Sequence, residues 1–286
     1  METVKTAKTR RPSYRGHFGS LVLMLLVKAA AVITAATLIF IVAYILIRGI
    51  PNLTPQLFAW KYTSENLSMM PAIINTVTMT LLTLVIAVPV GVGAAVYLVE
   101  YAPRTSRLVP VIRVTTETLA GIPSIVYGLF GYLFFNVALG WGYSMLGGAM
   151  TLAIMVLPLV MRTTQEALLA TPDSYREGSF GLGAGRLRTV VKIILPSAMP
   201  GILSGVILAI GRIVGETAAL IYTAGTVSGL PHDLLSSGRT LAVHMYALLS
   251  EGLYIPQAYA TAVVLMLLVL LINALSTRIA RRMTKG

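Results

Sequence analysis

The sequence predicts an all-α polytopic membrane protein with six transmembrane helices. Hydrophobic residues make up 56% of the 286-residue chain and charged residues only 11%, which leaves too little polar surface to cover the core of a soluble domain. The apolar residues also gather into segments of roughly the 20 residues that cross the hydrocarbon core of a bilayer. The net charge of +12 is spread over short clusters between these segments, which argues against a nucleic-acid-binding face.

Six segments have the length and composition of a membrane span: 21–47, 73–99, 118–137, 145–161, 201–224 and 258–279. The first has a longer apolar core than a cleaved signal peptide, so we expect a retained helix. Residues 118–161 contain no charged side chain, and the turn residues of NVALGWGYSMLGG divide this stretch into two helices joined by a hairpin. The absence of cysteine excludes disulfides and thiolate metal sites.

The distribution of Lys and Arg predicts the orientation of these helices. Basic residues concentrate in the N-terminal tail, in the connections that follow the second and fourth spans, and at the C-terminal end. Cytoplasmic segments carry such an excess, so we expect both termini in the cytoplasm. The outer segment 225–256 contains GRTLAVHMYALLSEG, whose apolar spacing predicts a helix that is too short to cross and lies on or dips into the outer face.

The largest predicted cytoplasmic connection contains the sequence EGSFGLGAGRLRTVVKIILP, residues 177–196. Just before it, Thr171 is suited to cap a helix, with Pro172 at its first position and Asp173 at the positive end of its dipole. Three glycines then break this helix, and an apolar pattern resumes until Pro196. We expect a helix, a glycine turn and a second helix, the first projecting a face of small residues toward a partner's groove. The alternative is a plain amphipathic connector.

The same stretch resembles the EAA signature of permease subunits of binding-protein-dependent ABC importers. The matching residues are Glu177, Gly178, Ser179, Gly183, Ile193, Leu195 and Pro196. Gly178 and Ser179 replace the usual alanines, which weakens the helix while keeping the side chains small. The resemblance implies that residues 166–196 form a coupling loop that docks on a separate ATPase.

This chain contains no GxxxxGK[ST] phosphate-binding loop. We therefore expect a permease subunit that is not itself an enzyme and binds no cofactor, with ATP and Mg used by the partner ATPase.

Two charges interrupt the fifth predicted span, Arg212 and Glu216. A charge at mid-bilayer costs about 2.5–3.5 kcal/mol on insertion scales, so these residues are expected to serve transport. Four positions apart, they would share a helix face and pair, with Gly215 leaving room for a small solute. Arginine suits an oxyanion because its planar fork makes two parallel hydrogen bonds, and Glu216 would hold that fork when the path is empty. The alternative is an internal ion pair that orients helices.

Longer stretches resemble phosphate-specific ABC importer permeases of the PstA type, namely residues 75–102, 117–132, 211–225 and 240–252. The resemblance implies a type I importer fold (MetI-like) and import of inorganic phosphate. It assigns Arg212, Gly215 and Glu216 to the substrate pathway, together with Arg113 and Glu117 at the cytoplasmic mouth of the third span. A surface ion pair is the alternative for Arg113 and Glu117.

The resemblance also implies the rest of the complex. Its members would be a PstC-type permease, two copies of an ABC ATPase subunit and an extracytoplasmic phosphate-binding protein, in the cytoplasmic membrane of a prokaryote and without nucleic acid. We expect a basic cytoplasmic tail at 1–19 and a transmembrane permease domain at 20–286, whose core spans about 71–280.

Three other classes of protein remain as alternatives. The first is an ABC permease for another oxyanion, such as sulfate, molybdate or phosphonate, or for an amino acid. The second is an ATP-independent secondary transporter or channel, which would need no docking loop. The third is a membrane-embedded enzyme, but the three histidines are scattered and neither HExxH nor GxSxG occurs.

Overall fold

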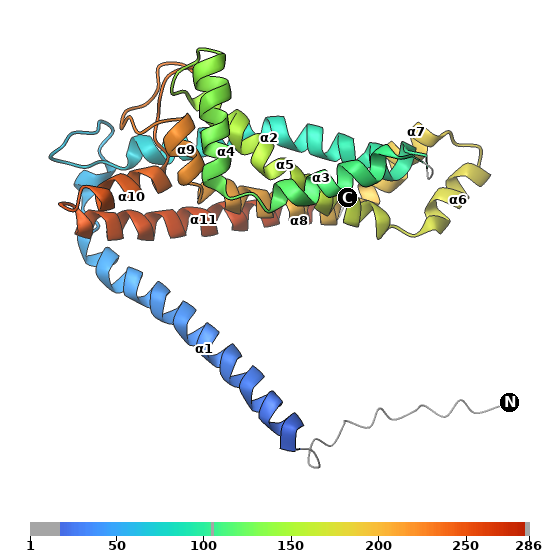
Figure 1. Cartoon of the computed structure of the whole chain (residues 1–286), viewed down its shortest axis with the longest axis horizontal. Coiled ribbons are helices and arrows are strands. Elements are labelled where there is room, and N and C mark those ends of the chain that lie inside the picture. Colours follow the sequence, from blue (N-terminus) through green and yellow to red (C-terminus); the bar gives the residue numbers. More distant parts are fainter. Residues whose placement is uncertain (1–17, 104–105, 284–286) are drawn as a thin grey trace. The chain divides into compact units, whose positions relative to one another are not determined.

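The computed structural model describes residues 18–103 and 106–283, and these residues contain helices and no strand (Figure 1). Most of the predicted basic tail therefore lies outside the described residues. The chain divides after Ile47 into two compact units. The long elements are α1 (Phe18–Gly49), α2 (Met70–Val96), α3 (Leu108–Ala120), α4 (Ser124–Gly131), α5 (Met145–Leu169), α8 (Leu195–Val214), α10 (Leu241–Ser250) and α11 (Ile255–Met283).

The first unit contains most of α1, which confirms a long helix in the first predicted span. Its described side chains are almost all exposed, including large ones such as Ile39, Phe40 and Ile47. A helix that is apolar on every side matches a lipid-facing span.

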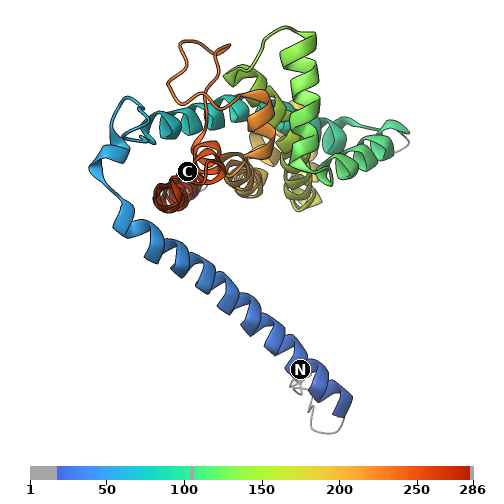
Figure 2. The same ribbon diagram turned by 60° about the vertical axis from the view of Figure 1, so that its left-hand side comes forward.

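The second unit, which begins at Arg48, is a bundle built around α5. This helix packs against both α2 and α8, and its buried residues form the centre of the main hydrophobic cluster. Close approach depends on glycine at Gly91, because a Cβ there would lie 2.8 Å from a methyl carbon of Val160. Helix α2 continues through Pro89. Figure 2 shows α11 (red) nearly end-on beside this bundle.

The third predicted span is not one continuous helix. It breaks between α3 and α4, whose flanking segments are bent by 102°. Pro123 disfavours helical backbone at Ile122, so α3 ends at Ala120 and α4 begins at Ser124. The wider turn η5 (Tyr132–Ala138) then completes the segment. Within the described residues, five helices are long and apolar enough to cross a membrane, and this bent pair brings the number to the predicted six.

The fifth predicted span differs from the expectation at both ends. The helix begins at Arg186 with the short α7 (Arg186–Thr189) and continues through a π-helical turn, η6 (Val190–Ile194), into α8. Pro196 does not end this helix: it lies two residues after the π-helical turn, and the helix continues through it to Val214. At the other end α8 stops at Val214, and a separate α9 (Ala218–Thr223) follows.

Two connecting segments lie at opposite ends of this unit (Figure 1). At one end is α6 (Asp173–Gly181), the predicted short helix of the coupling loop, and at the other is α10. Helix α10 is shorter than a membrane span, as predicted. Its residues Leu241, Ala242, Val243, His244 and Leu248 are buried in the protein, which favours the expectation of a helix that dips inward over one that lies on the surface. The two ends are consistent with the predicted cytoplasmic and outer faces, although the orientation itself stays a prediction.

Candidate functional site

The candidate site is a cavity of about 400 Å³ between α3, α5 and the end of α8. Three arginines from three different helices line it: Arg113, Arg162 and Arg212. Two carboxylates also line it, Glu117 from α3 and Glu166 from α5. The remaining lining residues are Thr116, Ala120, Met155, Pro158, Leu159, Gln165 and Leu169.

Helical periodicity explains why these side chains meet. On α3, Arg113, Thr116, Glu117 and Ala120 recur at intervals of three and four residues, so they share one face. The lining residues of α5 from Met155 to Leu169 follow the same rule. The cavity is therefore the space between two helix faces that carry charge, with Arg212 added from the last turn of α8.

The predicted pairing of Arg212 with Glu216 is wrong. The helix ends at Val214, so the two residues no longer share a helix face. A carboxylate oxygen of Glu216 instead accepts a hydrogen bond of 3.1 Å from the backbone N–H of Ala219, in the first turn of α9. Gly215 forms the C-terminal cap of α8. Of the three residues assigned to the pathway in this span, only Arg212 lines the cavity.

The other two predicted pathway residues, Arg113 and Glu117, do lie in the cavity wall. Both are exposed on α3. The ion pairs found among the described residues do not join these two, so the alternative of an i to i+4 surface pair is not what the structure shows. Both charges are instead available to a solute.

Sequence reasoning missed Arg162 and Glu166. They form an i to i+4 ion pair with 2.9 Å between Nε and Oε1, and their side chains are 68% and 62% exposed. Arg162 had been counted only as a basic residue of a cytoplasmic connection, whereas α5 extends to Leu169 and carries both residues into the cavity wall. With three guanidinium groups and two carboxylates, the wall holds one more positive than negative charge. Such a wall attracts anions of low charge.

The residues of the EAA signature occupy two different environments. Glu177 and Gly178 are exposed on α6, whereas Ser179 is buried and its hydroxyl lies 2.8 Å from that of Thr189. The expectation of a fully exposed small-residue face is therefore wrong for Ser179, which joins α6 to α7. The predicted cap at Thr171 is wrong: α6 begins at Asp173, its N-cap residue is Pro172, which has no side-chain acceptor, and the hydroxyl of Thr171 donates to the carbonyl of Ala167.

The glycine turn and the second half of the signature behave as predicted. Gly183 has φ +80°, a left-handed conformation that favours glycine. Ile193 and Leu195 pack against the buried cluster formed by Leu168, Ile194, Ala198 and Ile202. Pro196, at the start of α8, is exposed.

Comparison with solved structures shows which class of protein has this architecture. A methionine ABC transporter in inward-facing conformations, MetNI, matches with a TM-score of 0.60 at 23% identity, over 85% of this chain and 98% of that one. A bacterial alginate ABC transporter with its pentasaccharide-bound periplasmic protein matches with a TM-score of 0.63 at 16% identity, over 92% and 99%. The fold is that of the type I ABC importer permeases.

The chain belongs to the family described as binding-protein-dependent transport system inner membrane component, whose model matches residues 87–285. It is 35% identical to the probable ABC transporter permease protein YqgI of Bacillus subtilis, over 89% of this chain and 94% of that protein. It is 31% identical to the phosphate transport system permease protein PstA of Mycobacterium leprae, over 94% and 91%. The PstA protein of Pasteurella multocida is 35% identical, over 82% and 85%. The chain is thus an inner-membrane permease component.

Proposed function

We propose that this chain is the transmembrane subunit of an ATP-driven importer of inorganic phosphate. The observation that carries the proposal is the convergence of Arg113, Arg162 and Arg212 on one cavity. The printed names of several relatives, which are phosphate transport system permeases, support the same substrate.

The chemistry of the cavity suits an oxyanion that is bound briefly. Guanidinium groups make paired hydrogen bonds to phosphate oxygens and keep their charge at all physiological pH values. Glu166 holds Arg162 when the cavity is empty, and an entering phosphate competes with it for the same N–H groups. Because the ion pair is exposed, breaking it costs little. Phosphate can therefore take the place of Glu166 at little cost, because the released carboxylate is 62% exposed and stays solvated.

The partners follow from the family and from the coupling loop. We propose that ATP and Mg are used by two copies of a separate ATPase subunit, since this sequence has no phosphate-binding loop. Glu177 and Gly178, both exposed on α6, are the part of the EAA signature that would contact that ATPase. A PstC-type permease would complete the pathway, and an extracytoplasmic binding protein would deliver phosphate.

The test is ATP-driven uptake of radiolabelled phosphate into vesicles that contain the whole complex. Arg212→Gln is expected to lower uptake by about 10-fold to 100-fold, because a hydrogen bond to a charged group contributes about 1.5–3 kcal/mol. The matched control is Arg278→Gln, which removes an exposed arginine of α11 that does not line the cavity. Excess sulfate and amino acids serve as competitors.

Two outcomes would contradict parts of this proposal. Normal uptake by an assembled Arg212→Gln complex would remove this arginine from the phosphate path. A wild-type complex that assembles and imports sulfate or an amino acid, but no phosphate, would make the chain a permease for that substrate.

A further inference from the structure

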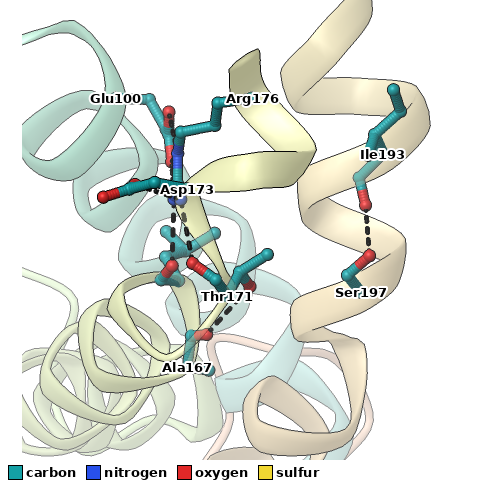
Figure 3. Close-up of polar contacts among 8 residues, drawn as sticks. Glu100, Ala167, Thr171, Asp173, Arg176, Ile193 and Ser197 are labelled. Atoms are coloured by element: carbon teal, nitrogen blue, oxygen red, sulfur yellow. Dashed lines mark hydrogen bonds and ion pairs between the residues drawn. The ribbon is translucent and has the colours of Figure 1, made fainter. Parts of the chain in front are cut away.

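One arginine fastens α6 to the end of α2. Arg176 of α6 forms a forked ion pair with Glu100, which lies in the π-helical turn η4 (Tyr97–Tyr101) that follows α2. Its Nη2 lies 2.6 Å from Oε1 of Glu100, and its Nε lies 3.2 Å from the same oxygen. The two side chains are only 17% and 8% exposed. Figure 3 shows the guanidinium and the carboxylate facing each other between the two segments.

The same guanidinium also binds the end of α5. Its Nη1 donates to the carbonyl of Thr171 at 2.9 Å (Figure 3), and its Nη2 donates to the carbonyl of Leu168 at 3.0 Å. Leu168 lies in the last turn of α5, and Thr171 follows two residues after the end of that helix. The hydrogen bond to Glu100 is the main reason that the pKa of Arg176 lies above its usual value. Arg176 thus joins α2, α5 and α6 through one permanently charged group.

The opposite, N-terminal end of α2 is hydrogen-bonded to the segment that leads into α10. The side-chain amide of Asn75 donates to the carbonyl of Arg239 at 3.1 Å. The hydroxyl of Thr76 accepts a hydrogen bond of 2.8 Å from the backbone N–H of Leu241, where α10 begins. These contacts are buried and lie one or two turns from the start of α2. A single helix therefore connects the base of α6 with the start of α10.

We propose that Glu100 and Arg176 are positioning residues that transmit the displacement of α6 to α2, and through Asn75 and Thr76 to the outer segment that contains α10. This inference rests on the proposed function, in which an ATPase moves α6. A buried ion pair is a poor stabilising device, because desolvation offsets most of its attraction. A forked ion pair does fix both the distance and the relative orientation of the two segments that it joins. Two segments held in this way move together as a rigid body.

The experiment removes the link while keeping the fold. In the variant Glu100→Met/Arg176→Met, unbranched apolar side chains replace both charges, a change that is often neutral for stability. Arg176→Lys is a second variant, which keeps the charge but loses the planar fork that fixes the direction of the contact with Glu100. The matched control is Asp173→Asn, since Asp173 contacts the same guanidinium at 3.1 Å but is 86% exposed.

Two readouts are measured on the reconstituted complex. The first is the number of phosphate ions imported per ATP hydrolysed. The second uses the absence of natural cysteines: spin labels at Ser174→Cys in α6 and Tyr97→Cys in η4, both exposed positions, report the distance between the two segments with and without ATP. This second readout needs no substrate.

In the wild type we expect a narrow distance distribution that ATP does not change. In the double Met variant, ATP should shift or broaden this distribution, and import per ATP should fall at least fivefold while hydrolysis and assembly persist. Asp173→Asn should stay within twofold of the wild type in both readouts. If the double variant fails to assemble, Arg176→Lys decides by the same criteria.

The inference is overturned if the variants keep wild-type import per ATP, or if ATP changes the label distance in the wild type. A wild type that imports no phosphate while the label distances behave as expected would contradict only the substrate assignment. The two hypotheses therefore fail separately.

Discussion

The two small residues of the EAA signature should respond in opposite directions to the same substitution. Gly178→Ala and Ser179→Ala each introduce the alanine that is typical of the signature. No atom lies within 4 Å of a Cβ built on Gly178, so alanine adds only helix propensity, about 0.5–1 kcal/mol. Ser179 would lose its hydrogen bond to Thr189 inside the loop.

The loss of stability expected for Ser179→Ala depends on which hydrogen bonds remain after the substitution. The hydroxyl of Thr189 keeps its hydrogen bond of 3.2 Å to the carbonyl of Gly185, so no buried donor is left unsatisfied. The cost is therefore that of one neutral hydrogen bond, about 1 kcal/mol. A change of this size alters the local opening equilibrium of a helix by about fivefold.

Amide hydrogen exchange of α6 in the isolated permease pair is the assay. Gly178→Ala should slow exchange of the α6 amides by up to about fivefold, and Ser179→Ala should accelerate it by about fivefold, since a free energy of 1 kcal/mol corresponds to that factor. Faster exchange in Gly178→Ala, or unchanged exchange in Ser179→Ala, would refute the reasoning, because it would mean that burial and space do not set the stability of this loop.

Two further predictions concern packing and pH. A Cβ at Gly205 of α8 would overlap with the side chain of Thr163, so Gly205→Ala should destabilise the protein by about 1–3 kcal/mol. Gly211→Ala, in the same helix but with no neighbour within 4 Å, should stabilise it by up to about 1 kcal/mol through helix propensity, and thermal midpoints that shift equally in both variants would contradict this account. Burial, and secondarily Arg239, lowers the pKa of His244 from 6.5 to about 3. The unfolded chain then binds a proton that the folded chain does not, so stability is full above pH 6.5 and decreases by up to about 1.4 kcal/mol per unit as the pH falls toward 3. The thermal midpoint of the wild type should therefore fall as the pH is lowered from 7 to 5, and it should fall less in His244→Leu. An identical fall of the midpoint in both proteins would refute this prediction.

Much of the fold could be predicted from the sequence because lipid imposes strong constraints. Segment length and apolar composition located the spans, and turn residues located the hairpin, where Gly140 and Gly142 adopt φ of +68° and +63°. The bend of the third span was missed. Its signal was local, in Pro123 and the glycine two positions before it, whereas a hydropathy window averages over such breaks.

The site was predicted in part, for a related reason. Arg212 was predicted from its charge inside a span, and Arg113 and Glu117 from the family resemblance, and the structure brings all three to one cavity. The predicted pairing of Glu216 with Arg212 was wrong because the i to i+4 rule assumes an unbroken helix, and α8 ends between the two residues. Arg162 was missed because its position in the cavity wall depends on how far α5 extends and on which helix packs beside it. The residues next to Arg162 in the sequence determine neither.

The π-helical turn at Val190–Ile194 makes the cavity depend on residues far from it. Such a turn contains one residue more than an α-helical turn, and each residue advances the helix by about 100°. Removing one residue there would therefore turn the downstream helix about its axis and carry Arg212 away from α5, although every lining side chain would still be present. The number of residues before α8, and not only their identity, sets the direction in which its arginine points.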